Sequence, residues 1–361
     1  MTLYKYNSII YVILMSHSPK KRKFHCVGDV SQEPLDKRCH FMTTCLEDSI
    51  INSDVVRGID RTFSHTIDPV ISIDNQKETG TCWIVAGLNM IRYKTIKNLD
   101  LPTDFKFSTS HLYFWSKLES INECLHLACE TKLLRETDRY VRDLYRTSMV
   151  SDGNYFWTFK DLVEKYGLMP DNVFKKNKPC EKSNFFETIL EKEIVASINT
   201  ILKYEGDSLT LIPSIMTHYK KIIATVISVP PTTFTFIYKK HGKLVKIGPI
   251  TPIEFYKNYS NIKLEEYIYV MANKRFSNNK VLRLQSSSGR GSSIIEKNYS
   301  DLFNVSLNRI NKLAKKSILH NNAVYFDSDT NYDMSKKYYL MDCNLYNYDY
   351  LNLTGFTPLK I

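Results

Sequence analysis

The sequence lacks two features that would define its class at once: paired cysteines and a long apolar run. Its eight cysteines are scattered over 361 residues without a C-x-x-C pair, so a disulfide framework is disfavoured and a reducing compartment is favoured. The longest N-terminal apolar run, residues 8–15, is too short to span a bilayer. No internal repeat or extended low-complexity segment interrupts the chain. With 43% hydrophobic residues, it can bury a large core in one elaborated domain or two lobes.

The N-terminal region does not follow the order of a secretory signal, in which positive charge precedes the apolar segment. Here the basic cluster of residues 19–23, PKKRK, follows the apolar run, and no small-residue cleavage site is evident. Such a cluster is typical of nuclear localisation, although a solvated tail explains it equally simply. We expect a cytoplasmic protein without membrane contact, with a nuclear location as the alternative. The start at Met1 or at Met15 stays open.

The net charge of +11 is unevenly distributed, because nearly all of the excess falls after residue 200. One interpretation is a solvated lysine-rich surface. The other is a basic face that binds nucleic acid without sequence preference. Its candidate residues are Lys239, Lys240, Lys243, Lys246, Lys274, Arg275, Arg290, Lys315 and Lys316.

The most informative stretch of the sequence runs from residue 75 to residue 92 and reads NQKETGTCWIVAGLNMIR. Apolar residues at helical spacing predict a buried helix with Cys82 in its first turn. A helix start stabilises a thiolate and lowers the pKa of a cysteine. Gln76 precedes Cys82 by six residues, where a returning loop could direct its amide at an oxyanion. The alternative for Cys82 is an ordinary buried cysteine.

The Gln-x5-Cys-Trp pattern, with Gly80 two residues before Cys82, resembles the nucleophile motif of papain-like cysteine peptidases. The longer stretch is similar to the bleomycin hydrolase or aminopeptidase C branch. Further similar segments follow in the order of that family, over residues 41 to 355. They are Arg61–His65, Phe107–Ser110, Phe114–Glu119, Asp152–Gly153, Leu162–Gly167, Thr251–Tyr256 and Asn344–Tyr346.

The resemblance implies an α+β, papain-like fold with a large helical insertion. The domains would be an N-terminal extension at 1–40, a helical lobe carrying Cys82 at 41–230, and a β-rich lobe at 231–361. The implied activity is that of an aminopeptidase hydrolysing N-terminal residues of peptides through a thioester on Cys82, with Gln76 as oxyanion donor. The family also implies a homohexamer and neither a cofactor nor a metal.

The family places its catalytic histidine and asparagine after the Asn344–Tyr346 block, and this sequence ends at Ile361 without those segments. We therefore expect a C-terminally truncated relative with an incomplete β lobe. A truncated gene, a separate second polypeptide and a non-catalytic scaffold are all consistent with this. Other histidines offer no clear replacement: His65 is expected to be structural, His111 to lie in the core, and His320 not to pair with its neighbouring asparagines. The set Cys124, His126 and Cys129 does not have a familiar zinc spacing.

Periodicity predicts the remaining elements only coarsely. Helices are expected within 108–146, at 159–166 and within 183–228. Strands are expected at 234–238, 244–247, 267–271, 281–284 and 323–326, the first two forming a hairpin through His241 and Gly242. A flexible loop is expected at 285–293.

Overall fold

A computed structural model describes residues 10–14, 45–60, 62–134, 150–285, 299–328, 334–335, 337–338, 340–342 and 344–347. The basic cluster at 19–23, Arg290, the region 135–146 and the loop expected after residue 285 lie outside the described residues. The chain divides into two compact units, Met1–Ile13 with His65–Phe326 and Leu14–Ser64 with Asp327–Ile361. The domain boundaries expected at residues 40 and 230 stay predictions.

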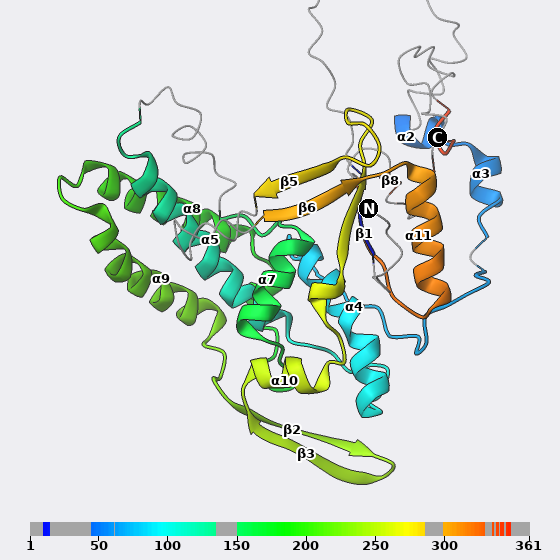
Figure 1. Ribbon diagram of the computed structural model, residues 1–361, viewed down its shortest axis with the longest axis horizontal. Coiled ribbons are helices and arrows are strands. Elements are labelled where there is room, and N and C mark those ends of the chain that lie inside the picture. The colour runs from blue at the N-terminus through cyan, green and yellow to red at the C-terminus, as the bar shows by residue number, and fades with distance from the viewer. Residues whose placement is uncertain are drawn as a thin grey trace, which may run out of the picture. The chain divides into compact units, whose positions relative to one another are not determined.

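Helices predominate up to residue 227, and short strands predominate after it (Figure 1). The helices are α2 (Leu46–Ser49), α3 (Ser53–Arg57), α4 (Cys82–Leu99), α5 (Thr109–Thr131), α7 (Phe156–Tyr166), α8 (Asn184–Lys203), α9 (Ile212–Ile227), α10 (Pro252–Tyr259) and α11 (Leu307–Leu319). The strands are β1 (Ile10–Leu14), β2 (Phe234–Lys240), β3 (Lys243–Ile250), β4 (Ile268–Ala272), β5 (Val281–Gln285), β6 (Tyr299–Asn304), β7 (Tyr325–Ser328), β8 (Met334–Ser335) and β9 (Leu340–Met341). The α+β class is confirmed. In the described part, no helix is long and apolar enough to cross a membrane.

Helix α4 forms the centre of the larger unit and begins at Cys82, as predicted. It is buried on most of its surface because its apolar residues occupy nearly every turn rather than one stripe. The helix ends where Asp100 adopts a left-handed conformation (φ 57°) and donates its N–H to the Ile96 carbonyl.

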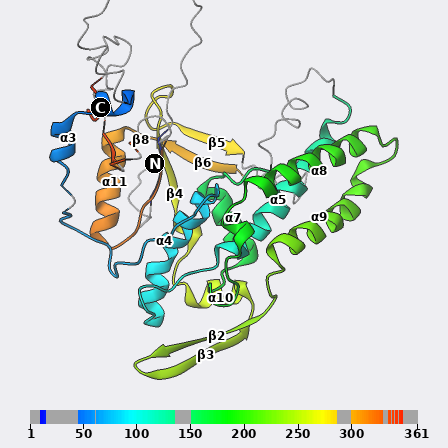
Figure 2. The same cartoon turned by 180° about the vertical axis from the view of Figure 1, so that it is seen from behind.

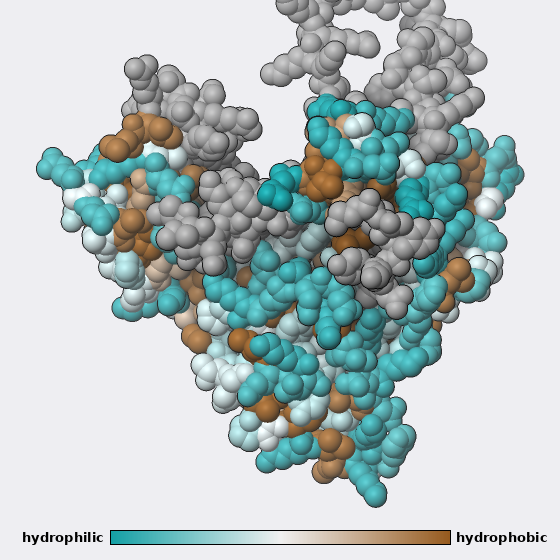
Figure 3. Space-filling model, viewed as in Figure 1, coloured by the Kyte–Doolittle hydropathy of each residue, from teal (hydrophilic) through white to brown (hydrophobic). Residues whose placement is uncertain are grey.

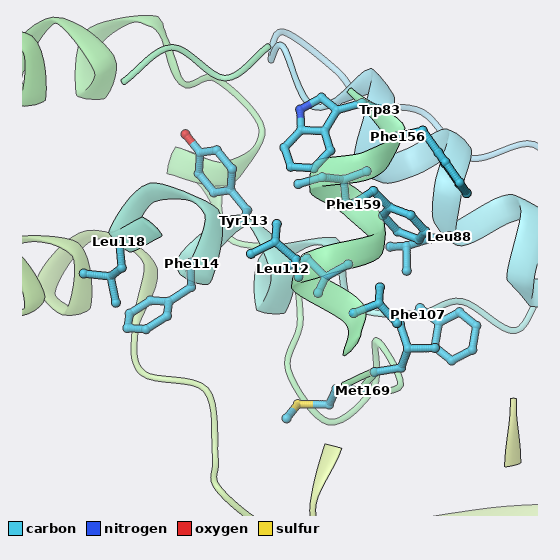
Figure 4. Close-up of a cluster of buried hydrophobic side chains, with 14 of the residues drawn as sticks. Trp83, Leu88, Phe107, Leu112, Tyr113, Phe114, Leu118, Phe156, Phe159 and Met169 are labelled. Atoms are coloured by element: carbon cyan, nitrogen blue, oxygen red, sulfur yellow. The ribbon is translucent and has the colours of Figure 1, made fainter. Parts of the chain in front are cut away.

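Helices α5 and α7 pack against α4 and complete the core around it (Figure 4). Leu112, Leu118, Ile121 and Leu125 form a buried stripe along α5. At Gly87 the helices α4 and α7 approach so closely that a Cβ would lie 2.6 Å from the Phe159 ring. The absence of a side chain at Gly87 thus permits this contact.

Helices α8 and α9 occupy the predicted helical insertion and lie beside α5 in both views (Figures 1 and 2). Each buries one apolar face, which includes Leu190 and Ile198 on α8 and Tyr219 and Ile223 on α9. The C-terminal end of α5 and this helix pair therefore form one helical layer.

The hairpin of β2 and β3 is confirmed, with its turn at His241 and Gly242. A five-stranded sheet has the order β5-β6-β4-β1-β7, in which β4 and β6 are parallel and β5 and β6 antiparallel. The expected strands near 267, 281 and 323 are confirmed as β4, β5 and β7. Strand β6 and helices α10 and α11 had not been predicted.

In the smaller unit, segments from distant parts of the sequence pair with each other. Asn52 donates its N–H to the Leu345 carbonyl, and Asn347 donates to that of Ile50. The Tyr346 hydroxyl donates to Glu47 at 2.7 Å. The Asn344–Tyr346 block thus helps to hold this unit together.

Candidate active site

Cys82 is exposed at the start of α4, although Trp83, Ile84 and Val85 directly after it are buried. Its Sγ lies 3.9 Å from the Gly80 carbonyl oxygen. Ala86, one turn further on, is also exposed. The sulfur therefore lies on the solvent-facing side of a helix that is otherwise mostly enclosed.

The loop of residues 75–81 leads into α4 and is stabilised by its own hydrogen bonds. The Gln76 amide Nε2 donates to the Thr79 carbonyl at 2.8 Å, and the Thr79 hydroxyl donates to the Gln76 carbonyl at 2.8 Å. The Lys176 ammonium also donates to the Gln76 carbonyl, at 3.1 Å. An amide nitrogen carries two N–H groups. The bond to Thr79 uses one and fixes the half-buried amide within the loop.

The same loop is paired with the segment that precedes α8. Glu78 donates its N–H to the Glu181 carbonyl at 3.0 Å and accepts from the Ser183 N–H at 3.4 Å. At the surface, the Lys182 ammonium lies 2.9 Å from the Glu78 carboxylate. These bonds fix the backbone before Cys82 on its outer side.

Asp152 contacts the loop of residues 75–81 and the start of α4 from their buried side. Its carboxylate accepts hydrogen bonds from the Gly80 N–H at 3.2 Å, the Tyr113 hydroxyl at 2.9 Å and the Ser183 hydroxyl. Its carbonyl accepts from the Trp83 indole N–H at 2.6 Å. A Cβ at Gly80 would lie 2.7 Å from the Asp152 Cβ, so only glycine fits at this approach.

A buried charge cluster surrounds the Asp152 carboxylate. The Lys117 ammonium lies 2.6 Å from Asp152 and 3.3 Å from Glu187, and the Lys117 side chain is only 1% exposed. Burial acts to raise the pKa of Asp152, but Lys117 and the neighbouring donors hold it well below its usual range. Burial, followed by the hydrogen bond with Asp152, raises the pKa of Glu187 to about 7.

Sequence reasoning did not identify this cluster as part of the site. Asp152 and Lys117 appeared only as members of family-like segments. The available signal was a lysine at position 117, among the mostly apolar residues from Leu112 to Leu125. A lysine on a buried face needs a carboxylate partner, but its spacing does not say which one.

Four histidines contact groups other than Cys82. His111 is buried, bonds through Nε2 to the Tyr166 carbonyl at 3.1 Å, and has its pKa lowered to about 4 by burial. This confirms its core position. His218 lies 3.5 Å from Glu193, and His241 lies 3.1 Å from Asp100.

His320 bonds through Nδ1 to the Lys316 carbonyl, 2.8 Å away at the end of α11. The amide of its neighbour Asn321 donates instead to the Asp68 carbonyl. His65 is exposed.

The part of the chain that the structure describes contains no group of three or more metal-ligating side chains in position to hold an ion. Cys124, His126 and Cys129 all lie on α5. Burial raises the pKa of Cys124 to about 12, which disfavours the thiolate that a metal requires.

Comparison with known proteins gives a consistent result. Residues 32–357 match the sequence model of a family described as Peptidase C1-like. Aminopeptidase W of Lactobacillus delbrueckii subsp. lactis is 26% identical over 313 residues, which cover 85% of this chain and 70% of that protein. Human bleomycin hydrolase is 27% identical over 318 residues, which cover 84% of this chain and 69% of that protein.

A solved structure shares the fold. The crystal structure of PepW from Lactobacillus rhamnosis HN001 superposes with a TM-score of 0.81 at 23% identity, over 89% of this chain and 72% of that one.

Proposed function

The chain belongs to the Peptidase C1-like family, and on that premise we propose that it is a cysteine peptidase whose nucleophile is Cys82. The observation that carries the proposal is the exposed sulfur at the first position of an 18-residue helix that is otherwise mostly enclosed. The positive end of a helix dipole favours the thiolate over the thiol.

In the proposed reaction, the Cys82 thiolate attacks the carbonyl carbon of a peptide bond. A carbon–sulfur bond forms and the carbonyl oxygen becomes an oxyanion. When this intermediate collapses, the carbon–nitrogen bond breaks, the amine leaves with a proton, and a thioester remains on Cys82. Water then hydrolyses the thioester and restores the thiol.

Two donors are suited to the oxyanion. The backbone N–H of Cys82 lies in the first turn of α4, where N–H groups point out of the end of the helix. The Gln76 amide is anchored through Thr79, which leaves its second N–H to donate to the oxyanion. Donors that are fixed before the reaction need no reorganisation when charge develops.

The reaction also requires a base, and a histidine is the usual one for a cysteine nucleophile. His111, His218, His241 and His320 are each bonded to another group of the described chain, and we do not assign them this role. We propose that another histidine, from elsewhere in the chain or from a second polypeptide, receives the proton. Turnover by the chain alone would decide between these sources.

The proposed substrates are peptides from which single N-terminal residues are removed. The support is the name aminopeptidase W of one relative. The homohexamer that the resemblance implies and the cytoplasmic location expected from the sequence stay predictions.

Hydrolysis of an aminoacyl aminocoumarin tests the proposal directly. With a reducing agent present, the full chain is expected to release aminocoumarin, and prior treatment with iodoacetamide is expected to abolish that release. The absence of any release above that of buffer would contradict a complete catalytic site within this chain alone.

A second candidate function, a non-catalytic scaffold that binds nucleic acid, is favoured by one observation. Four candidate cations, Lys239, Lys240, Lys243 and Lys246, lie together on the β2–β3 hairpin. The lower part of Figure 3, where Figure 1 shows this hairpin, is mostly hydrophilic with scattered apolar patches.

If these four lysines contact phosphates, affinity for single-stranded DNA is expected to fall about 50-fold between 50 and 200 mM salt. Changing all four to glutamine should remove most of this dependence. The same change at Lys192, Lys203, Lys220 and Lys221, on α8 and α9, is the matched control. Binding that is equally salt-dependent in both variants would contradict a role for the hairpin.

A further inference from the structure

The cluster around Asp152 contacts the chain on both sides of Cys82. Asp152 accepts from the N–H of Gly80, two residues before the cysteine, and from the indole of Trp83, directly after it. No other described residue is recorded with hydrogen bonds to both of these positions. A displacement of Asp152 would therefore move the backbone that presents the sulfur.

The groups that face Asp152 come from every element packed around it. They are Tyr113 and Lys117 of α5, Cys180 from the segment before α8, Ser183, and Glu187 in the first turn of α8. The ammonium of Lys117 also donates to the Val150 carbonyl at 2.6 Å. Lys117 is the cation closest to both carboxyl groups, and it is shared between them.

One cation cannot neutralise both a buried and a half-buried carboxylate. The side chains of Lys117 and Asp152 are 1% and 2% exposed, whereas that of Glu187 is 19% exposed. The shorter ion pair belongs to Asp152, at 2.6 Å against 3.3 Å for Glu187. Asp152 therefore keeps the negative charge, and Glu187 is the carboxyl group that takes up a proton.

We propose that Asp152 is a positioning residue for Cys82, and that the protonation of Glu187 controls how firmly it holds the chain around the sulfur. This role for Asp152 rests on the proposed function, because it requires Cys82 to be the nucleophile. A protonated Glu187 donates to Asp152, and the cluster is then neutral. An ionised Glu187 repels Asp152 and leaves the cluster with a net negative charge.

The direction of the pH effect follows from the two pKa shifts. The pKa of Glu187 is raised from 4.5 to about 7, so its stabilising contribution is fully present below 4.5 and is lost as pH rises through about 7. The pKa of Asp152 is lowered, so its contribution is lost only in acid, below its ordinary value of 3.8. Near neutral pH, Glu187 is therefore the one of these two carboxyl groups whose charge changes.

The test measures alkylation of Cys82 by iodoacetamide between pH 5 and 9, with the Cys82 peptide quantified by mass spectrometry. The unaltered protein is expected to show two titration steps, one for the thiol and one near pH 7. At a separation of roughly 10 Å, a charge gained on the half-buried Glu187 would change the thiol–thiolate equilibrium by between about twofold and fifteenfold. Glu187→Gln, which stays neutral and can still donate to Asp152, should react faster above pH 7 by such a factor and match the unaltered protein at pH 5.

Glu191→Gln, one turn further along α8, is the matched control and should keep both steps. A profile of the unaltered protein that follows a single titration, or a Glu187→Gln profile identical to that of the unaltered protein, would overturn the proposal. The measurement on the unaltered protein needs no variant to fold. Because alkylation does not depend on peptide hydrolysis, the proposal can fail while the peptidase assay succeeds, and the reverse.

Discussion

Replacing Lys117 by methionine is expected to lower the free energy of unfolding by about 3–5 kcal/mol. Methionine fills a similar volume but leaves the Asp152 carboxylate buried without its cation. The lost partner is a 2.6 Å contact between side chains that are 1% and 2% exposed. Because Asp152 also accepts hydrogen bonds from Gly80 and Trp83, the loop before Cys82 should unfold together with the core. Urea unfolding at pH 7 measures the change.

Lys165→Met provides the matched control for this substitution. Lys165 lies 2.7 Å from Glu119 but is 51% exposed, and surface pairs of this kind contribute about 0–1 kcal/mol. An equal loss of unfolding free energy in the two variants would contradict the claim that the Lys117–Asp152 pair stabilises the protein more than a surface pair does.

Replacing Cys82 by alanine is expected to lower the rate of aminocoumarin release by at least ~10⁴-fold, as removal of a catalytic nucleophile does in other peptidases. Since the side chain is exposed, the free energy of unfolding should change by less than about 0.5 kcal/mol. Loss of activity without loss of stability separates a catalytic role from a structural one. Steady-state kinetics and urea unfolding of the same preparation supply both values.

Cys45→Ala is the control for this variant because Cys45 is a second exposed cysteine, located outside the 75–92 stretch. It should leave both values unchanged. Full turnover by Cys82→Ala, or a loss of several kcal/mol in its free energy of unfolding, would indicate that Cys82 is an ordinary structural cysteine.

The local parts of this fold were predictable from sequence. The α4 helix and its start at Cys82 follow from a dense apolar run after Gly80, and the end of α7 follows from Gly167. The hairpin follows from alternating residues on both sides of His241 and Gly242. In each case the determining residues are neighbours in the sequence.

Helix α10 was missed although its signal was present. Thr251 and Glu254 form a capping box, in which each side chain bonds the backbone of the other, and Pro252 is the first residue of the helix. Strand β6 was missed for a different reason. Its position between β5 and β4 comes from pairing with strands that are distant in the sequence.

The candidate site was likewise predictable only where its residues are close together in the sequence. Cys82 and Gln76 could be proposed from their spacing and from the family-like motif. The Asp152 cluster could not, because Lys117, Asp152 and Glu187 lie on three separate segments, and only tertiary packing makes them neighbours. The bond from the Gln76 amide to the Thr79 carbonyl likewise depends on the loop conformation.

The most direct test of this account compares two exposed cysteines in one molecule. At pH 6, iodoacetamide should alkylate Cys82 at least ~10-fold faster than Cys45, because a thiol whose pKa is lowered by one unit or more carries that much more thiolate. Peptide mass spectrometry resolves the two rates in a single sample. Equal rates at the two cysteines would contradict the claim that α4 and the 75–81 loop present Cys82 as an activated nucleophile.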